Sequence, residues 1–335
     1  MLRAMDSAVA GLRAHQNKLD VIGHNIANVN TAGYKSQSYM FKEAMYQTST
    51  NSTSGSGSAG GSGGVNAAQY GYGTMMGSIW VDMTASTPTQ MGGLTATIDG
   101  QGFFMTMSIA DKNGIAINGA NASEVIKGSN FQYTRVGQFK IDSDGYLVDS
   151  NSNNFVYGFR NNGDCLTQTN FDTDNLKPIR VCMIDANGDG VVSDNPDKVA
   201  LAKSVRIDSE GKIIVGIKVQ ETVTDAAGNT TTQEVIKEAV IGQVAVATFQ
   251  NQEGLTKAGG SYYTASRGDN AGICEATPPG KSGTASLITG YVEASNVDMA
   301  REFSEMITTQ RGFQANSRII TVSDQILEEL VNMKR

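Results

Sequence analysis

The residues best suited to bind a metal ion lie in the segment DANGDGVVSDNP, residues 185–196. Asp185, Asn187 and Asp189 stand at its first, third and fifth positions and a glycine follows at the sixth, as in a calcium-binding loop of the EF-hand type. The twelfth position, where such a loop needs a bidentate Glu, is Pro196, and no helical pattern flanks the segment. We therefore favour a turn between strands, with a weak Ca²⁺ site as the alternative.

Other residue types that carry chemistry are few. The chain has two histidines, His15 and His24, which lie nine residues apart on one expected helix and so face different directions. We expect both on the helix surface. No GxSxG nucleophile motif is present, and the glycine-rich segment 99–102 lacks the Lys-Ser/Thr of a phosphate loop. The sequence therefore predicts no catalytic residues, no cofactor and no enzyme.

The three cysteines are too few for a disulfide-rich scaffold. Cys165 and Cys182 fall in the same expected outer β region, so a bridge between them is one interpretation if the chain is exported to oxidising surroundings. Cys274 would then be left over. Free, partly buried thiols are the interpretation that we favour.

Length and charge narrow the classes of protein further. With 335 residues, the chain has room for two domains or slightly more. The 33 acidic residues outnumber the 26 basic ones, which argues against a nucleic-acid binder. No run of 18 apolar residues exists, so we expect no membrane insertion. Because Asp6 and Arg13 interrupt the first apolar stretch, we expect no cleaved signal peptide.

Both ends of the chain have the apolar spacing of amphipathic helices. The first helix is expected to run from residue 2 to about residue 30, and the second from residue 296, with Ser295 or Asn296 as its N-cap. We expect the two helices to pair in a coiled-coil-like manner and the remaining apolar side chains to face neighbouring copies. The predicted assembly seam consists of Leu2, Met5, Val9, Leu12, Leu19, Ile26, Met299, Phe303, Met306, Phe313, Ile319, Val322, Ile326 and Leu330.

The middle of the chain has the pattern of β structure, with hairpins expected in segments 96–107, 139–148 and 205–215. The predicted fold class is therefore α+β, with paired terminal helices and mainly β domains inserted between them. The expected domains are a terminal helical core (1–33 and 293–335), a Gly/Ser-rich connector (34–74), an inner β domain (75–150 and 240–292) and an outer β domain (151–239).

Four motifs in order then resemble the bacterial flagellar rod and hook proteins. They are NIANVNTAGYK (25–35), ATIDGQGFF (96–104), TRVGQFKIDSDGYL (134–147) and the segment from Gly290 to Arg335. The resemblance implies that the first motif belongs to the core assembly region, where it would end the inner helix and send the chain outward. Its residues are Asn25, Asn28, Asn30, Thr31, Gly33, Tyr34 and Lys35, of which Gly33 suits a left-handed turn.

The resemblance also implies a function. Segment 240–263 resembles the strand by which a hook chain returns from its outer domain, so we expect a structural subunit of the hook, a flexible tube that transmits motor torque to the filament. Subunits of this family polymerise with themselves, and the resemblance implies the distal rod, hook cap, hook–filament junction proteins and type III export apparatus as partners. It implies an extracellular place in the flagellum. The alternatives are a distal rod subunit, which would largely lack an outer domain, and a secreted Ca²⁺-binding adhesin-like β protein.

Overall fold

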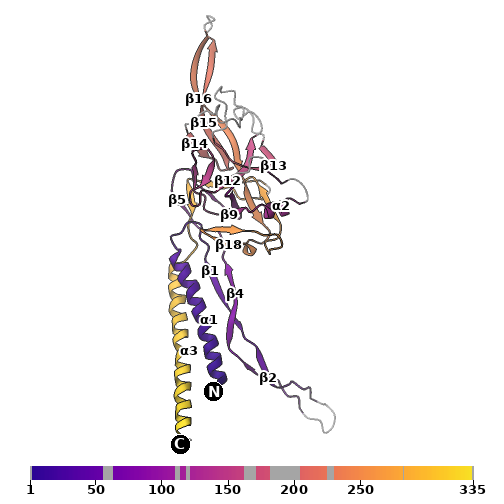
Figure 1. Ribbon diagram of the computed structural model, residues 1–335, viewed down its shortest axis with the longest axis vertical. Coiled ribbons are helices and arrows are strands. Elements are labelled where there is room, and N and C mark those ends of the chain that lie inside the picture. Colours follow the sequence, from indigo (N-terminus) through magenta and orange to yellow (C-terminus); the bar gives the residue numbers. More distant parts are fainter. Residues whose placement is uncertain are drawn as a thin grey trace. The chain divides into compact units, whose positions relative to one another are not determined.

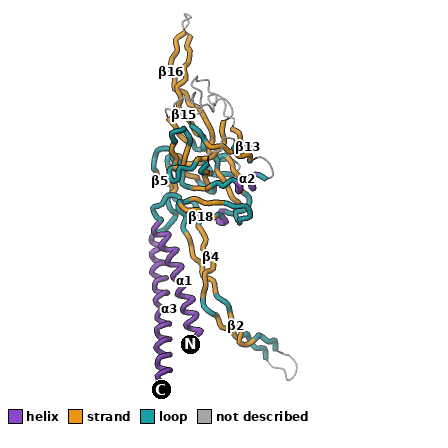
Figure 2. The backbone as a smooth tube through the Cα atoms, in the orientation of Figure 1, coloured by secondary structure: helices purple, strands orange, loops and turns teal. Residues whose placement is uncertain are grey.

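The computed structural model describes residues 2–55, 63–109, 114–117, 121–161, 171–181, 204–224, 230–281 and 283–333. It divides the chain into two compact units. The helical unit comprises residues 1–29, 35–82 and 297–335, and the β unit comprises residues 30–34 and 83–296. The fold class is α+β as predicted, because the chain has a long helix at each end and many strands between them in the sequence (Figure 2).

The helical unit contains α1 (Leu2–Ala27) and α3 (Met299–Met333), which lie side by side along the length of α1 (Figure 1). Both helices were predicted from apolar spacing, and the end of α1 falls where Asn and Thr residues were expected to stop it. The N-cap of α3 differs from our expectation. The Asp298 carboxylate accepts hydrogen bonds from the backbone N–H groups of Ala300 (2.9 Å) and Arg301 (3.3 Å), so Asp298 takes the capping role.

Two pairs of strands complete the helical unit. Strands β1 (Gln37–Glu43) and β4 (Thr74–Val81) are antiparallel, and so are β2 (Tyr46–Thr50) and β3 (Ala68–Gly71). The expected connector at residues 34–74 is therefore largely an antiparallel ribbon. Our prediction gave too much weight to the Gly/Ser run and too little to the Tyr, Phe, Met and Thr residues beside it, which favour strands.

The described residues of the β unit form strands and one short α-helix. The strands form antiparallel pairs throughout, and the longest path of neighbours runs β14-β15-β16-β12-β7-β9-β19-β18. Two further pairs are β21 with β6 and β22 with β5. The elements are β5 (Pro88–Gln90), β6 (Ala96–Ile98), β7 (Phe103–Met107), β8 (Ile115–Ala116), α2 (Ala122–Gly128), β9 (Gln132–Thr134), β10 (Phe139–Ile141), β11 (Leu147–Asp149), β12 (Phe155–Asn161), β13 (Phe171–Pro178), β14 (Ser204–Ile207), β15 (Lys212–Thr224), β16 (Thr230–Val244), β17 (Val246–Phe249), a 3₁₀ turn (Gln252–Gly254), β18 (Thr256–Gly259), β19 (Tyr262–Thr264), β20 (Cys274–Thr277), β21 (Leu287–Thr289) and β22 (Tyr291–Glu293).

Two of the three expected hairpins are confirmed. β10 pairs with β11, and β14 pairs with β15. In the second turn, the Asp208 carboxylate accepts the Ser209 N–H at 2.8 Å, and Gly211 takes a positive φ of 74°. The expected hairpin at residues 96–107 is wrong, because β6 pairs with the distant β21 and β7 pairs with β9, β12 and β17. A turn motif predicts that the chain reverses direction, but it does not determine which strands pair with each other.

The core of the β unit does not separate at residue 150, where we expected a boundary between an inner and an outer domain. One hydrophobic cluster joins Phe104 and Leu147, from the expected inner domain, to Val156 and Ile213, from the expected outer domain. All four side chains are fully buried. This cluster therefore extends across residue 150, and the compact units observed are the helical unit and the β unit.

Candidate assembly surface

Two glycines mark where α1 and α3 meet, each against a polar side chain of the other helix. A Cβ atom added at Gly11 would lie 2.8 Å from the Asn316 Nδ2 atom, and one added at Gly312 would lie 2.8 Å from the His15 Cε1 atom. Ala14 is buried to 2% exposure on the same side of α1. A larger residue at Gly11 or Gly312 would therefore have to displace the Asn316 or the His15 side chain from this contact.

The predicted seam lies beside this close approach. The packed row on α1 runs through Gly11, His15, Lys18 and Ile22, and it is displaced by one residue from the predicted row through Leu12 and Leu19. One residue is about 100° around a helix, so the predicted side chains lie beside the contact.

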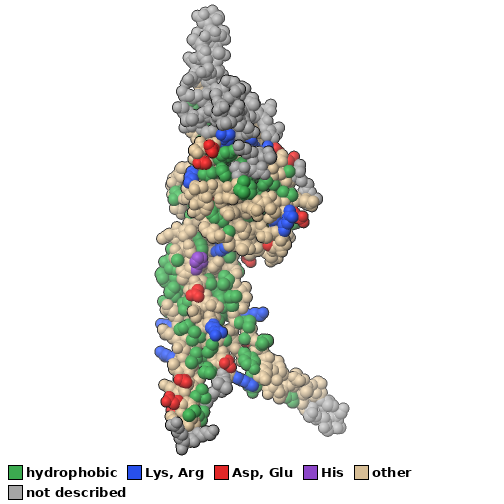
Figure 3. Space-filling model, viewed as in Figure 1, with side chains coloured by type: hydrophobic (Ala, Val, Ile, Leu, Met, Phe, Trp, Pro, Cys, Tyr) green, Lys and Arg blue, Asp and Glu red, His purple; other side chains and the backbone are tan. Residues whose placement is uncertain are grey.

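An uncovered apolar stripe lies on the last turns of α3. The exposed fractions in this stripe range from 40% to 77%. Its members share one face of the helix: Ile319, Val322, Ile326, Leu330 and Met333, of which all but Met333 were predicted for the seam. Phe303, also predicted, and Ile307 and Val331, which were not, are exposed on α3 outside this stripe. Hydrophobic side chains are visible along this part of the molecule in Figure 3. On α1, Val9 is 36% exposed, whereas the remaining described members of the seam are half-buried: Met5, Leu12, Leu19, Ile26, Met299, Met306 and Phe313. The side chain of Leu2 lies outside the described residues.

The ribbon adds a second exposed apolar surface, which the sequence analysis missed. Trp80, the single tryptophan of the chain, is 37% exposed on β4, and Met40 is 54% exposed on β1. The aromatic side chains among the polar ones of residues 37–50 could have indicated these strands. Our sequence analysis gave more weight to the neighbouring Gly/Ser run.

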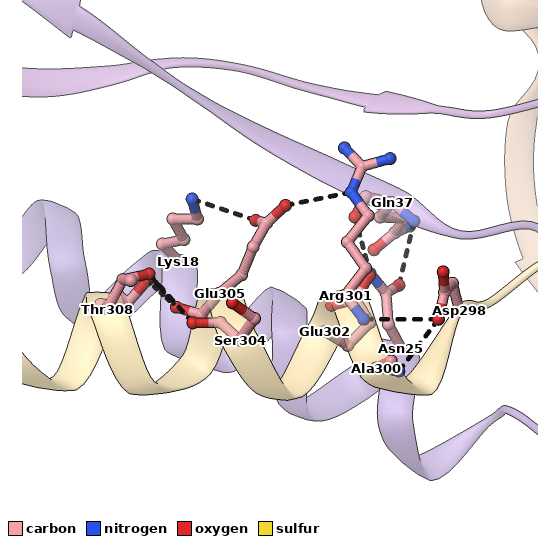
Figure 4. A network of polar contacts seen from close by, with 11 residues as sticks. Lys18, Asn25, Gln37, Asp298, Ala300, Arg301, Glu302, Ser304, Glu305 and Thr308 are labelled. Carbon is pink, nitrogen blue, oxygen red and sulfur yellow. Dashed lines mark hydrogen bonds and ion pairs between the residues drawn. The ribbon is translucent and has the colours of Figure 1, made fainter.

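An ion-pair network joins α1 to α3 (Figure 4). The Glu305 carboxylate lies 3.2 Å from the Lys18 ammonium and 3.2 Å from the Arg301 guanidinium. Burial alone would raise the pKa of Glu305, but hydrogen bonds from Lys18 and Arg301 outweigh it and lower that pKa. The network therefore favours the ionised carboxylate and fixes the position of one helix along the other.

Asn25, in the first motif, connects three elements of the helical unit (Figure 4). Its side chain is buried, donates to the Gln37 backbone carbonyl (2.8 Å) and accepts the Gln37 N–H (2.9 Å). It also donates to the Glu302 carboxylate at 3.0 Å. Burial raises the pKa of Glu302, and the bond from Asn25 opposes that rise. Asn25 thus ties the end of α1 to the first residue of β1 and the first turn of α3.

The other motif residues lie around the end of α1. Asn28 donates to the His24 carbonyl at 2.9 Å, and Tyr34 N–H donates to the Thr31 carbonyl at 3.3 Å. Gly33 has a φ of 65°, which confirms the predicted left-handed turn. The remaining two residues differ in exposure: Asn30 is exposed and Lys35 is fully buried.

Residues 30–34 are bound into the β unit. Gly33 N–H donates to the Glu293 carbonyl at 2.8 Å, and the Lys257 ammonium lies 4.8 Å from the centre of the Tyr34 ring. Burial lowers the pKa of Lys257 to about 8. The motif is therefore divided between the two units.

A buried ion pair in the β unit was also missed by the sequence analysis. The Arg135 guanidinium and Glu293 carboxylate lie 3.3 Å apart, and both side chains are 1% exposed. Arg135 also donates to the carbonyls of Met83 (3.3 Å) and Gly100, while Glu293 accepts the Ser86 N–H at 3.0 Å. The pair joins segments that lie far apart in the sequence, so local patterns could not reveal it.

The structure gives no test of the predicted metal loop. Asp185, Asn187 and Asp189 lie outside the described residues, as do Cys165 and Cys182. Within the described ranges, no group of three or more His, Cys, Asp or Glu side chains could hold a metal ion. Cys274 is a free, buried thiol, and burial raises its pKa to about 12. No helix in the described part of the chain is both long and apolar enough to cross a membrane.

Comparison with known proteins identifies the terminal regions. Residues 288–333 match the family model "Flagellar basal body rod FlgEFG protein C-terminal", and residues 5–35 match "Flagella basal body rod protein". These ranges cover all of α3, most of α1 and the first motif. The two matches therefore coincide with the elements that carry the α1–α3 contact.

Full-length relatives extend the comparison to the rest of the chain. The flagellar basal-body rod protein FlgG of Bacillus subtilis is 35% identical over 338 aligned positions, which cover all of both chains. The flagellar hook protein FlgE of Borreliella burgdorferi is 25% identical over 464 positions, also covering all of both chains. The FlgG protein of Buchnera aphidicola subsp. Acyrthosiphon pisum is 28% identical over 336 positions, covering 98% of this chain and 99% of the relative.

Proposed function

The chain belongs to the flagellar rod and hook protein family and is a structural subunit of the flagellar axis, and from this premise we propose that it polymerises with itself into a helical tube. The observation that carries the proposal is the uncovered apolar stripe on α3, from Ile319 to Met333. Apolar side chains at helical spacing on one face are typical of a helix that packs against a partner.

The geometry favours many copies rather than a closed pair. The stripe on α3 and the exposed surface around Trp80 on β4 are different surfaces of one helical unit. A contact between two different surfaces repeats from copy to copy, and it produces rings or open helical filaments. Each copy would cover the stripe of its neighbour. Burial of an Ile or Leu side chain contributes about 1.5 to 3 kcal/mol relative to full exposure, so several half-exposed ones suffice for a stable contact.

The hook is the first candidate segment of the axis. In that role the tube would act as a flexible joint that transmits torque while it bends. The large β unit supports this candidate, since β12 to β16 occupy the region that the resemblance associates with the outer part of hook subunits. Polar, exchangeable contacts between outer regions would let neighbouring copies slide during bending, because large apolar contacts would lock them.

The distal rod is the second candidate, and the relatives favour it. The B. subtilis relative is a rod protein and aligns with all of this chain at 35% identity. The B. burgdorferi hook protein aligns over 464 positions against the 335 residues here, so at least 129 of its residues have no counterpart in this chain. The β12–β16 region therefore does not by itself separate a hook subunit from a rod subunit, as our sequence analysis assumed.

The proposed partners follow from this role. Besides further copies of itself, the tube would contact the segments before and after it: the distal rod, the hook cap and the hook–filament junction proteins. Delivery would use the flagellar type III export apparatus without cleavage of a signal peptide, and the polymer would lie outside the cell membrane. A Ca²⁺-binding adhesin is not supported, since that alternative gives no role to the α1–α3 pair. We propose no enzymatic role.

Electron microscopy of the purified chain after salting-out tests the proposal. We expect long tubes with a regular subunit repeat. Curved tubes would favour the hook and straight tubes the distal rod. A chain that stays monomeric, or forms only closed dimers, at concentrations where amorphous precipitation is absent would contradict polymerisation.

A further inference from the structure

His15 lies where three elements of the helical unit meet, although the sequence analysis expected it on the surface. On α3, a Cβ atom added at Gly312 would be 2.8 Å from the His15 Cε1 atom and 2.9 Å from Nε2, so the ring lies directly against the Gly312 backbone. On β1, the Phe41 ring meets the imidazole edge-to-face, with 5.3 Å between the ring centres. The half-buried imidazole therefore contacts α3 and β1 from α1, and we call this place the α1–α3–β1 joint.

The surroundings of this ring suit its neutral form. Its Nδ1 atom is buried without a hydrogen-bond partner. The positively charged group nearest along α1 is Lys18, whose ammonium lies 5.7 Å from the centre of the Phe41 ring. A proton added to His15 would place a second positive charge in a contact whose other sides are the Gly312 backbone and a phenyl ring.

The carboxylate on this side of α3 is already engaged. Glu305 lies 3.2 Å from Lys18 and 3.2 Å from Arg301, so it balances those cations. On α3, Arg311 next to Gly312 is exposed, and so is Arg13 on α1. Strand β4 has no charged residue.

Beside Phe41 on β1, Lys42 and Glu43 are both exposed, so neither reduces the burial of the imidazole. The charges that face the joint from α1, α3 and β1 therefore offer a proton on His15 little compensation.

We propose that His15 is an acid-sensitive switch that keeps the α1–α3–β1 joint closed while its imidazole is neutral and loosens the joint when the imidazole is protonated. The consequence for a polymer rests on the proposed function, since the joint supports the helices that would carry the contacts between copies. The tube would then form at neutral pH and dissociate in mild acid.

The direction of the pH dependence follows from the geometry. Burial, and then the charge of Lys18, hold the pKa of His15 below its ordinary value of 6.5. The unfolded chain therefore takes up this proton at a higher pH than the folded chain. The contribution of the neutral imidazole to the stability of the joint is fully present above about pH 6.5 and decreases as the pH falls below that value.

The chain has only two histidines, so the comparison of histidine variants separates His15 from Lys257 and Glu302, whose pKa values are also shifted. His15→Phe keeps a planar aromatic ring that does not titrate, and His24→Phe is the matched control at an exposed position of the same helix. Polymer is formed from the full chain at about pH 8, and the concentration of unpolymerised chain is measured by sedimentation at steps down to about pH 5.5. This range lies above the ordinary pKa values of Asp and Glu.

We expect this concentration to rise about threefold or more towards pH 5.5 in the wild type and in His24→Phe, and to stay constant within about twofold in His15→Phe. An unchanged pH response in His15→Phe, or a flat response in the wild type, would overturn the switch. If the phenyl ring disturbs the helices, as judged by circular dichroism at pH 8, His15→Gln replaces it with the same expected outcome.

Failure of the proposed function can be told apart from failure of the switch. If no polymer forms at any pH, the proposed function fails. The switch is then tested separately, by following the helical circular dichroism of the monomer over the same pH range. A decrease in acid that His15→Phe abolishes supports the switch. Absence of that decrease, or of helical signal at every pH, refutes it.

Discussion

Removing one partner of the buried Arg135–Glu293 pair should destabilise the β unit strongly. Both side chains are 1% exposed, so neither charge can turn to water when its partner is lost. In Glu293→Gln, one amide oxygen can still accept the Ser86 N–H, which now donates to the carboxylate at 3.0 Å. The amide N–H₂ group, in contrast, would face the donors of Arg135.

The size of the effect follows from the remaining contacts. Breaking a buried ion pair by removing one partner costs about 3–5 kcal/mol. We expect Glu293→Gln to fall near the lower limit, about 3 kcal/mol, because Arg135 still donates to the carbonyls of Met83 and Gly100. We expect Arg135→Met to approach about 5 kcal/mol, since it removes the Arg135 guanidinium from a carboxylate that is only 1% exposed. The double variant should cost clearly less than the sum of the two.

Guanidinium unfolding of the full chain, followed by near-ultraviolet circular dichroism, measures these differences. The buried tyrosines Tyr133, Tyr157 and Tyr263 report on the β unit, whereas the single tryptophan lies in the helical unit. Glu238→Gln is the matched control, because the Arg206–Glu238 pair is 60% and 65% exposed and should contribute at most about 1 kcal/mol. If Glu293→Gln cost no more than Glu238→Gln, the pair would not hold these segments together, and this reasoning would be refuted.

Three further predictions concern assembly, pH and thiol chemistry. Leu12→Ala and Ile326→Ala should each raise the concentration of unpolymerised chain about fivefold or more. Gln325→Ala, at an exposed position beside the stripe, should not raise it. Equal losses of monomer melting temperature and of assembly would count against a role of these side chains between copies. Glu305→Gln should remove part of the acid dependence of the helical circular dichroism signal. The pKa of Glu305 is lowered in the folded chain, so its contribution to stability is present above the ordinary value of 4.5 and is lost as the pH falls through the folded value. A variant that loses helix in acid as the wild type does would contradict this prediction. Cys274, with a pKa raised to about 12, should resist alkylation by iodoacetamide at about pH 8 until the chain unfolds. Rapid labelling of Cys274 in the native protein, located by peptide mass spectrometry, would show that the thiol is accessible and would contradict this prediction.

Local patterns in the sequence determined the helices and the tight turns of this protein. The three- and four-residue spacing of apolar side chains predicted α1 and α3, and Gly33 predicted its left-handed turn. The Asp142–Gly145 and Asp208–Gly211 turns also follow from their own residues. These features need only interactions within a few residues, which one sequence contains in full.

The tertiary structure alone decided which surfaces those elements present. Apolar spacing indicated a stripe on each helix, but it did not show that Gly11 and Gly312 receive the Asn316 and His15 side chains, in a contact one residue away from the predicted row. The same contact moved His15 from an expected surface position into a joint. Strand partners and the Arg135–Glu293 pair join segments that are far apart in the chain. Packing distances and long-range partners depend on the whole folded chain, because each side chain takes its place only where the others leave room.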